Sequence, residues 1–501
     1  MTRIDRRFLL RGALAAVGGA LLGACAPGTT LVQPAGPEVR AAEQARRPGR
    51  AREFVITARQ GRVDLGGPVV DTWLYGERLP GTPVQVTAGE RVRARLRNEL
   101  PAETTVHWHG LALRNDADGV PGVTQPPVAA GAEHLYEFTA PHPGTYWFHP
   151  HHGTQLDRGL YAPLIVADPA EPLGYDHEWT IVLDDWMDGV TGTPDEVLAE
   201  LSAMSGGEGG HGGHSMPAPG PSASPKWPHM MMNAESDLLG GDAGDVRYPH
   251  FLLNGRVPAA PETLTVTPGA RVRLRVVNAG ADTAFRLALG DHPLTVTHAD
   301  GFPVTPVETD ALLLGMGERY DVLVTVKDGA FPLVAEAEGK RGLARAILRS
   351  SPSAAPPDPE ARPGESAARL LTYDQLEPLP AVRLAPRKPD RTLTLRLTGT
   401  MARYDWAING RTYDPEVVEP ISAGERVRLS FVNDSLMWHP MHLHGHTFAL
   451  PGGARKDTAI VLPGKRLDVD FDTDNPGIWM IHCHNLYHAE AGMMSLIGYR
   501  R

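Results

Sequence analysis

Four pairs of histidines, each separated by one residue, are the first feature of this sequence that could do chemistry. They are His107/His109, His149/His151, His442/His444 and His482/His484. In a β-strand, side chains at positions i and i+2 point to the same face, so each pair would present two imidazoles to one place. A single pair is more often an ordinary surface or core pair. Four pairs favour a cluster of metal ions, and imidazole is a good ligand for copper.

A cysteine lies inside the last pair, between His482 and His484. Strand alternation sends the sulfur of Cys483 to the face opposite the two imidazoles. A thiolate, two imidazoles and a weak thioether form the ligand set of blue-copper electron-transfer sites, and the chain offers this set in Cys483, His439, His488 and Met493. A lone cysteine is often a small buried hydrophobe, but its histidine neighbours favour a metal ligand. An electron at Cys483 would reach the histidine cluster through two covalent neighbours.

The elements that must position these residues are three repeats of one turn-and-strand pattern. Residues 89–98, 269–278 and 424–433 each run nine positions from a glycine to an asparagine, with alternating apolar and polar side chains. Such self-similarity signals tandem domains. With 54 Gly, 46 Pro and 6% aromatic residues, the 501-residue chain suits short strands joined by tight turns. We therefore expect an all-β protein of three β-sandwich domains, at residues 51–170, 171–352 and 384–501.

Two stretches of biased composition are expected to be linkers. Residues 25–50 are rich in Pro, Ala, Gly and Arg, and residues 353–383 begin with a run of Pro, Ala and Ser. Such compositions are typical of tethers between folded units.

The repeats also predict which domains hold metal. Nine and eleven residues after the closing asparagine, the first and third repeats are followed by His107/His109 and His442/His444, whereas the middle one is followed by Leu287 and Leu289. The middle domain is therefore expected to serve as a spacer and wall. A second alignment, from the Pro-Gly dipeptides at 143–144 and 476–477, places Pro150 opposite Cys483. Only the third domain could then hold a thiolate-bound copper.

In their order along the chain, these motifs resemble the four copper signatures of the multicopper oxidase family. They are His-Trp-His-Gly at 107–110, His-Pro-His at 149–151, His-Pro-Met-His-Leu-His-Gly at 439–445, and the His-Cys-His, His and Met of 482–493. The resemblance implies three tandem cupredoxin-like Greek-key β-sandwich domains and four copper ions. It also implies an oxidase that couples one-electron oxidation of a reductant to the four-electron reduction of O2 to water.

The same resemblance implies how the ligands divide among the coppers. One type 1 copper would take His439, Cys483, His488 and Met493. One type 2 copper would take His107 and His442. Of two type 3 coppers, one would take His109, His149 and His484, and the other His151, His444 and His482.

Reduction of O2 to water needs protons, so a carboxylic acid is expected close to the cluster. Asp118, in the Asp-Gly-Val-Pro-Gly run at 118–122, resembles the family's acid near the type 2 copper. Glu490 is a second candidate. Some bacterial members carry an acid directly after the type 1 histidine, where this chain has Ala489. For either carboxylate, a solvated loop residue is the alternative interpretation.

The reductant is predicted from a segment of low complexity at residues 204–232. It holds Met204, His211, His214, Met216, His229, Met230, Met231 and Met232 among Gly, Pro and Ser. Thioethers are soft ligands that suit Cu(I). Met437 and Asp434, close to the type 1 ligand His439, could form a Cu(I) docking point. We therefore expect oxidation of Cu(I) in copper detoxification.

Several alternatives to this prediction remain open. The segment could be a disordered loop whose methionines have no role, and Met437 could pack under the copper site. The reductant could be a phenol or diamine, as in laccases. A non-catalytic copper-binding cupredoxin protein is a further alternative, which the loss of any cluster ligand would favour.

The N-terminus and the charge bear on location and partners. Arg6-Arg7-Phe8 and the apolar run at 13–22 resemble a twin-arginine leader at residues 1–24. Cys25 then resembles a lipoprotein acceptor, although a plain cleaved signal is the alternative. We expect export to the periplasm or the outer face of the envelope, with lipid on Cys25 as the only membrane attachment.

A net charge of -11 disfavours nucleic acid as a partner, which leaves O2 and a small reductant. The sequence predicts no particular oligomeric state.

Overall fold

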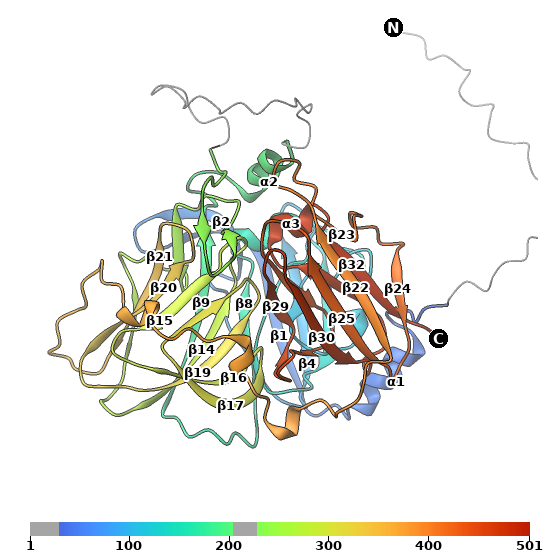
Figure 1. Ribbon diagram of the computed structural model, residues 1–501, viewed down its shortest axis with the longest axis horizontal. Coiled ribbons are helices and arrows are strands. Elements are labelled where there is room, and N and C mark those ends of the chain that lie inside the picture. The colour runs from blue at the N-terminus through green and yellow to red at the C-terminus, as the bar shows by residue number, and fades with distance from the viewer. Residues whose placement is uncertain (1–29, 204–227) are drawn as a thin grey trace, which may run out of the picture.

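The computed structural model describes residues 30–203 and 228–501 (Figure 1). The predicted leader, Cys25 and residues 204–227 of the Met/His-rich segment lie outside these ranges. The described chain consists mostly of β-strands, which form three successive β-sandwiches as expected. Figure 1 shows the middle sandwich, in green to yellow, beside the third, in orange to red, with strands of the first, in blue, between them. In the described ranges, no helix is long and apolar enough to cross a bilayer.

The first sandwich pairs a sheet of order β2-β1-β4-β6 with a sheet of order β3-β8-β7-β5. Its strands are β1 (Ala51–Asp64), β2 (Val69–Tyr75), β3 (Val84–Thr87), β4 (Arg91–Glu99), β5 (His107–His109), β6 (Glu133–Thr139), β7 (Gly144–His149) and β8 (Ala162–Ala167). Every second residue of β4 is buried, beginning with Val92 and ending with Asn98. The predicted alternation therefore separates the core face of this strand from its arginine-rich outer face.

The middle sandwich pairs sheets of order β12-β9-β14-β19-β16-β17 and β13-β21-β20-β15-β18. Its strands are β9 (His177–Trp186), β12 (His250–Leu253), β13 (Glu262–Thr265), β14 (Arg271–Asn278), β15 (Phe285–Leu289), β16 (Leu294–Ala299), β17 (Phe302–Thr309), β18 (Ala311–Leu314), β19 (Arg319–Thr325), β20 (Ala330–Ala337) and β21 (Leu343–Arg349). The short strands β10 (Glu235–Ser236) and β11 (Gly241–Asp242) pair separately. Leu287 and Leu289 are fully buried on β15, where the other domains place histidines.

The third sandwich pairs sheets of order β23-β22-β25-β30-β27-β28 and β24-β32-β31-β26-β29. Its strands are β22 (Arg391–Thr398), β23 (Ala407–Ile408), β24 (Val418–Ile421), β25 (Arg426–Asn433), β26 (His439–Leu443), β27 (Phe448–Ala449), β28 (Arg455–Lys456), β29 (Thr458–Val461), β30 (Arg466–Asp472), β31 (Ile478–Cys483) and β32 (Met494–Tyr499).

The predicted repeat is one strand used three times. β4, β14 and β25 each pair in parallel with the first strand of their domain, and antiparallel with β6, β19 and β30 respectively. The asparagine that closes each repeat, at 98, 278 and 433, donates its side-chain amide to two backbone carbonyls. One carbonyl lies in the loop that follows (Ala102, Thr283 and Met437), and the other lies farther along the chain (Val128, Leu314 and Val461). These bonds fix the path toward β5, β15 and β26, so the repeat positions the strands that carry the histidines.

Residues 30–50 differ from the linker that their composition predicted. They contain helix α1 (Pro37–Ala45), which lies near the C-terminus in Figure 1. Glu43 accepts hydrogen bonds from the backbone N (2.7 Å) and Oγ1 (2.6 Å) of Thr139 in the first domain. Arg46 donates to Asn475 Oδ1 (2.9 Å) in the third. Apolar residues such as Val39, which is 1% exposed, provide the core contact that holds the segment in place.

Residues 353–383 connect the second and third domains through three short 3₁₀ turns, at Gly364–Ala367, Tyr373–Gln375 and Pro380–Val382. This connection is also anchored, because Tyr373 Oη donates to Glu318 Oε1 at 2.7 Å. Two further helices are α2 (Pro194–Ala203) and α3 (Leu486–Glu490). Asn485 caps α3 by accepting hydrogen bonds from the backbone N of Tyr487 and His488.

Candidate metal centre

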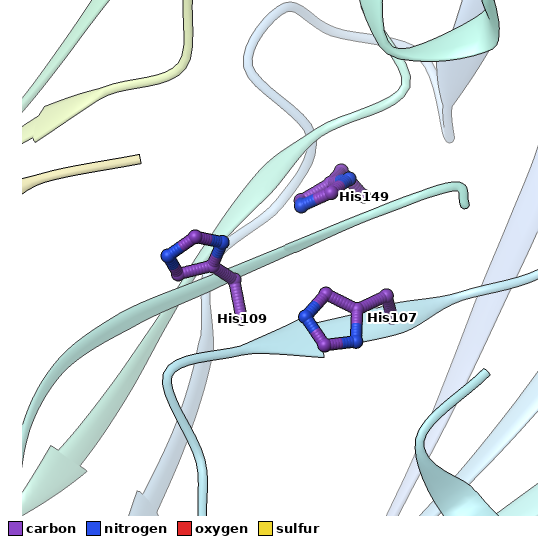
Figure 2. A group of neighbouring side chains, drawn as sticks. All are labelled: His107, His109 and His149. Carbon is purple, nitrogen blue, oxygen red and sulfur yellow. The ribbon is translucent and has the colours of Figure 1, made fainter. Parts of the chain in front are cut away.

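Two pairs of neighbouring strands gather the histidines. In the first domain β5 pairs with β7, so His107 lies opposite His149. In the third domain β26 pairs with β31, so His442 lies opposite His482. Directly opposed side chains on one face of a sheet lie about 5 Å apart. Figure 2 shows the result in the first domain, where the imidazoles of His107, His109 and His149 lie together.

The two groups of imidazoles meet between the first and third domains. The rings of His107 and His444 are stacked with centroids 3.9 Å apart, and those of His109 and His442 with centroids 3.8 Å apart. The ring of His151 lies 5.0 Å from that of His482. The fold therefore brings all eight predicted cluster histidines into one place, and all except His151 are buried.

This cluster has the free donor atoms that a metal site needs. Within the described part of the chain, six buried ring nitrogens have no hydrogen-bond partner: Nε2 of His107, His149 and His442, Nδ1 of His109, and both nitrogens of His484. Buried polar atoms without partners are costly, and metal coordination would satisfy them. Burial, and then neighbouring imidazoles, lower the pKa values of His149, His151, His482 and His484 well below the usual range. These rings are therefore neutral, as metal ligands must be.

The ligand atoms group in part as predicted. One group, with ligand atoms within 4.8 Å of one another, is His151, His444 and His482. His107 belongs to two groups, one with His109 and His149 and one with His442 and His444. The copper that each of these remaining histidines would bind therefore stays a prediction.

The predicted type 1 residues form a separate buried group. The Nδ1 atoms of His439 and His488 lie 3.1 Å apart, and they lie 3.6 and 3.7 Å from Cys483 Sγ. Met493 is fully buried, and its carbonyl accepts a hydrogen bond from the backbone N of Cys483 (3.1 Å). Burial raises the pKa of the Cys483 thiol. A cation bound to the sulfur would offset this effect, because a coordinating thiol is deprotonated.

Both histidines of this group are held through their outer nitrogens. His439 Nε2 lies 2.8 Å from Ser435 Oγ, and His488 Nε2 lies 2.9 Å from Asp245 Oδ2. Such partners fix the rings so that Nδ1 faces the cysteine sulfur. Asp245 belongs to the middle domain, which therefore does more than form the predicted spacer and wall.

Asp118 lies against the cluster. Its carbonyl accepts a hydrogen bond from His107 Nδ1 (2.9 Å), and its Oδ2 accepts one from His444 Nδ1 (2.9 Å). The side chain is fully buried, and its Oδ1 has no hydrogen-bond partner among the residues described. Asp118 thus holds one histidine from each of two domains, and its Oδ1 lies 3.2 Å from His107 Nδ1.

Asp457 is a second carboxylate at the cluster, which the sequence analysis did not single out. Its Oδ1 lies 3.1 Å from His109 Nε2, and its carbonyl lies 3.0 Å from His442 Nδ1. Burial alone would raise the pKa of Asp457, but the Arg319 guanidinium and the two histidines outweigh burial and hold this pKa well below its usual range. The available signal was its position after the third-domain histidine pair, as Asp118 follows the first-domain pair.

Glu490 lies at the end of α3 and lines a small cavity against the cluster. Burial, with a smaller effect of Asp195, raises the pKa of Glu490 to about 7. The same cavity is lined by the histidines at 149, 151, 482 and 484. A carboxylic acid in this place can reach the space beside the cluster.

The predicted Cu(I) docking residues have more enclosed surroundings than expected. Met437 is 1% exposed and packs in the same hydrophobic core as Cys483 and Met493. Both carboxylate oxygens of Asp434 are engaged by Arg396, at 2.8 and 2.7 Å. Direct Cu(I) binding by this pair would require both side chains to rearrange.

The described end of the Met/His-rich segment is attached to the fold. His229 Nδ1 lies 2.7 Å from Glu200 Oε1, and its Nε2 lies 2.9 Å from the Thr191 carbonyl. Met230 is 4% exposed, whereas Met232 is 66% exposed. His229 and Met230 therefore stabilise the packing, and only Met232 of these three presents its side chain to solvent.

Comparisons with known proteins agree with this geometry. Three family models, each described as multicopper oxidase, match residues 57–171, 213–353 and 386–499. The chain is 45% identical to multicopper oxidase MmcO of Mycobacterium tuberculosis, over 99% of this chain and 97% of that protein. It is 29% identical to a copper resistance protein A homolog of Pseudomonas syringae pv. tomato (88% and 91%), and 28% identical to laccase-2 of Botryotinia fuckeliana (89% and 81%).

Solved structures show the same fold. The crystal structure of Fet3p, described as a multicopper oxidase that functions in iron import, has a TM-score of 0.73 and 22% identity, and the match covers 90% of each chain. That of a multi-copper oxidase from Pseudomonas thermotolerans has a TM-score of 0.66 and 26% identity, and the match covers 90% of this chain and 99% of that one.

Proposed function

Because this chain belongs to the multicopper oxidase family, whose members are copper oxidoreductases that use O2, we propose that its reductant is Cu(I). The balanced reaction converts four Cu(I), one O2 and four protons into four Cu(II) and two waters. Its role would be detoxification of copper outside the cytoplasm.

We propose the division of resident coppers that the sequence resemblance implied. A type 1 copper is held by His439, Cys483, His488 and Met493, and a type 2 copper and two type 3 coppers are held by the eight cluster histidines. Copper held by these residues would supply one-electron transfer at the type 1 site and four-electron reduction of O2 at the cluster. Cys483 connects the two sites, because its covalent neighbours are His482 and His484.

The carboxylate side chains near the type 1 group are the observation that favours Cu(I) as the reductant. Asp242 forms a β-bridge with Met437, two residues before His439. Burial, and then the nearby carboxylates of Asp245 and Asp282, raise the pKa of Asp242 to about 6. Asp282 is paired with Lys340 (2.6 Å) and Asp245 with His488 (2.9 Å), whereas Asp242 has no basic side chain paired with it among the described residues. The Asp242 carboxylate beside the electron acceptor favours a small cation over a neutral molecule.

Softer ligands lie at the same edge. Met231 is half-buried and packs against the cluster of hydrophobic residues that contains Trp438, the neighbour of His439. Thioethers beside carboxylates suit Cu(I) better than a hard cation. We propose that Cu(I) approaches the type 1 group here, from the side to which the Met/His-rich segment is attached.

Proton supply is proposed for two acids. Asp118, whose carboxylate lies 3.2 Å from His107 Nδ1 and 2.9 Å from His444 Nδ1, is placed to move a proton at the type 2 side of the cluster. Glu490 is placed to do so from the cavity beside the histidines at 149, 151, 482 and 484. The two acids lie at different groups of histidines, so one route does not make the other redundant.

A phenol or diamine is the second candidate reductant. Leu436 is 86% exposed in the loop before His439, which would suit contact with an aromatic substrate near the type 1 group. A laccase is also among the relatives.

Export by the twin-arginine route and a lipid on Cys25 are also proposed. Residue 30 lies only five positions after Cys25, and Arg501 donates its backbone N–H to the Thr30 carbonyl (2.9 Å). A lipid anchor would therefore attach on the side of the molecule that carries the C-terminus. Mass spectrometry of the mature N-terminus tests this directly, since an unmodified Cys25 would contradict the anchor.

The reductant is tested by steady-state rates on Cu(I) and on a phenol, measured with one copper-loaded preparation. We expect kcat/KM for Cu(I) to exceed that for the phenol, and Asp242→Asn to lower only the Cu(I) value. A higher value for the phenol, unaffected by Asp242→Asn, would assign the protein to the laccase alternative.

A further inference from the structure

Arg319, from the middle domain, is completely buried at the junction of the three domains. It begins β19, and its backbone N donates to Asp300 Oδ1 at 2.8 Å. Its Nε donates to the carbonyl of Thr145 in the first domain (3.1 Å). Its two terminal nitrogens donate to Oδ1 (2.7 Å) and Oδ2 (2.8 Å) of Asp457 in the third domain. One guanidinium therefore joins all three domains and uses its planar fork on a single carboxylate.

Asp457, whose carboxylate is held by Arg319, in turn contacts two cluster histidines. Oδ1 of Asp457 accepts a hydrogen bond from His109 Nε2, and its carbonyl accepts one from His442 Nδ1. Thr458 Oγ1 lies within reach of the same ring nitrogens, at 3.2 and 3.1 Å. With the carboxylate plane fixed by Arg319, His109 and His442 cannot rotate without losing these bonds.

The contact also determines which nitrogen His109 offers to a metal. The free ring nitrogen is Nε2 in His107, His149 and His442, but it is Nδ1 in His109. Both oxygens of Asp457 accept hydrogen bonds from Arg319, so in the 3.1 Å contact with Oδ1 it is His109 that donates, through a proton on Nε2. The lone pair is then on Nδ1, which points away from Asp457.

Two glycines make room for this arrangement. A Cβ on Gly110, directly after His109, would lie 2.3 Å from Arg319 Nη2 and 2.7 Å from Asp457 Oδ2. A Cβ on Gly317 would lie 2.9 Å from His109 Cε1 and 3.0 Å from His484 Cδ2. The backbone of the first and middle domains is therefore shaped closely around the arginine, the carboxylate and the histidines.

We propose that Arg319 is a positioning residue of the copper cluster, which acts through Asp457 to fix the orientation and tautomer of His109 and His442. The middle domain, which offers Leu287 and Leu289 where the others offer histidines, thus still controls cluster geometry. This inference rests on the proposed division into a type 1 site and a cluster, but it is independent of the identity of the reductant.

The test compares Arg319→Met with Arg319→Lys and with a matched control, Arg273→Met. Arg273 is also a buried arginine of the middle domain, paired with Asp321 at 2.6 Å, but its side-chain partners are Asp321, Glu171 and His298 rather than a cluster histidine. Each protein is loaded with copper and examined for copper per chain, the blue thiolate absorption and the electron paramagnetic resonance of the non-blue copper. Thermal unfolding of the copper-free proteins measures the purely structural effect.

We expect Arg319→Met to keep the blue absorption and to bind cluster copper roughly 10–100-fold more weakly, the usual effect of removing a partner of a ligating histidine. Arg319→Lys should be intermediate, because lysine keeps the charge but lacks the planar fork. Arg273→Met should lower the Tm of the copper-free protein and retain all its copper with an unchanged resonance spectrum.

The proposal is overturned if Arg319→Met binds cluster copper as the wild type does, or if it loses blue and cluster copper in equal proportion. If Arg319→Met does not fold, Asp457→Asn, which is nearly the same shape, decides the question by the same two criteria. Copper content of the wild type distinguishes a failure of the Arg319 proposal from a failure of the proposed division into a type 1 site and a cluster. A wild-type chain that binds no cluster copper would contradict the proposed division itself.

Discussion

Two aspartates at the cluster, Asp118 and Asp457, make the same kinds of hydrogen bond to histidines but differ in their charged partners. Asp118 holds His107 by its carbonyl and His444 by its carboxylate, and Asp457 holds His442 and His109 in the same way. Each therefore ties one domain to the other. Arg319 neutralises Asp457, whereas among the described residues Asp118 forms ion pairs only with histidines, His107 and His444. This difference suits Asp457 to a fixed structural role and leaves Asp118 for exchange of protons.

Replacing Cys483 by serine should separate the two copper sites. A hydroxyl is a poor substitute for a thiolate, so the blue absorption and turnover should both be lost. Cluster copper should remain, because Cys483 points away from the eight imidazoles. Visible absorption and copper per chain check the prediction. A Cys483→Ser protein that stays blue would show that the type 1 site is elsewhere.

Gly110→Ala should damage the cluster through Arg319 and Asp457. The added Cβ cannot fit at 2.3 Å from the guanidinium, so the ion pair has to open. Gly122→Ala is the matched control, since Gly122 has a similar φ (76° against 87°) but no atom within 4 Å of the new Cβ. The control should lose about 1–2 kcal/mol from its positive φ alone. Gly110→Ala should lower the Tm further and weaken cluster copper, and equal effects of the two substitutions would contradict this account.

At the scale of elements, the sheets depend on buried ion pairs as well as on apolar alternation. Asp321 on β19 accepts hydrogen bonds from Arg273 (2.6 Å) and Arg275 (2.9 Å) on β14, and from Thr145 Oγ1 (2.7 Å) on β7 of the first domain. Breaking a buried pair leaves an uncompensated charge, which destabilises strongly. This group therefore joins the first two domains on the side of β19 that faces β7.

The ion pairs of Asp321 with Arg273 and Arg275 should make the stability of the fold depend on pH. Burial alone would raise the pKa of Asp321, but Arg275 and then Arg273 lower it from 3.8 to about 2. Because the folded-state pKa is depressed, the stabilisation is complete above the ordinary pKa and is lost as pH falls toward 2. The difference corresponds to about 2 kcal/mol. Asp321→Asn should thus lower the Tm by a constant amount from pH 7 to about 5, and the gap to wild type should narrow below about pH 4.

The control for this prediction is Asp310→Asn. Asp310 also pairs with an arginine, Arg369, but that partner is 58% exposed, and surface pairs contribute little. A gap between Asp321→Asn and the wild type that stayed constant down to pH 3 would show that the carboxylate contributes by shape rather than by charge.

The sequence predicts those elements whose pattern is local. Alternating residues predict β4, β14 and β25, and histidines separated by one residue predict the metal ligands that the strand pairing then brings together. The bonds from Arg319 to Asp457 and from Asp245 to His488 span 138 and 243 positions, so no local pattern indicates them. The α1 segment was missed for a related reason. Its composition resembles a tether, and its order comes from contacts of Glu43 and Arg46 with two distant domains.

At the scale of the whole molecule, the three domains divide the work unequally. The first and third supply the cluster histidines, the third also supplies the type 1 group, and the middle one supplies Asp245 and Arg319 as supports. The middle domain also contains residues 203 and 228, which flank residues 204–227 of the Met/His-rich segment. A domain that lacks histidines at the repeat-matched positions therefore still supports the predicted copper ligands of the other two.

Deleting residues 204–227 tests the proposed role of this segment in Cu(I) delivery. The deletion should stop before His229 and Met230, because these residues pack against Glu200 and the core. A soft arm raises the local concentration of Cu(I) near the electron acceptor, so its loss should lower kcat/KM for Cu(I) and leave the blue absorption and copper content unchanged. Oxidation of a bulky phenol should be unchanged or faster, since an arm near the type 1 edge obstructs large molecules more than an ion. A variant with all methionines and histidines of 204–227 replaced by serine controls for length and should match the deletion in Cu(I) oxidation. An equal loss of both activities in the deletion would mean that the segment supports the fold.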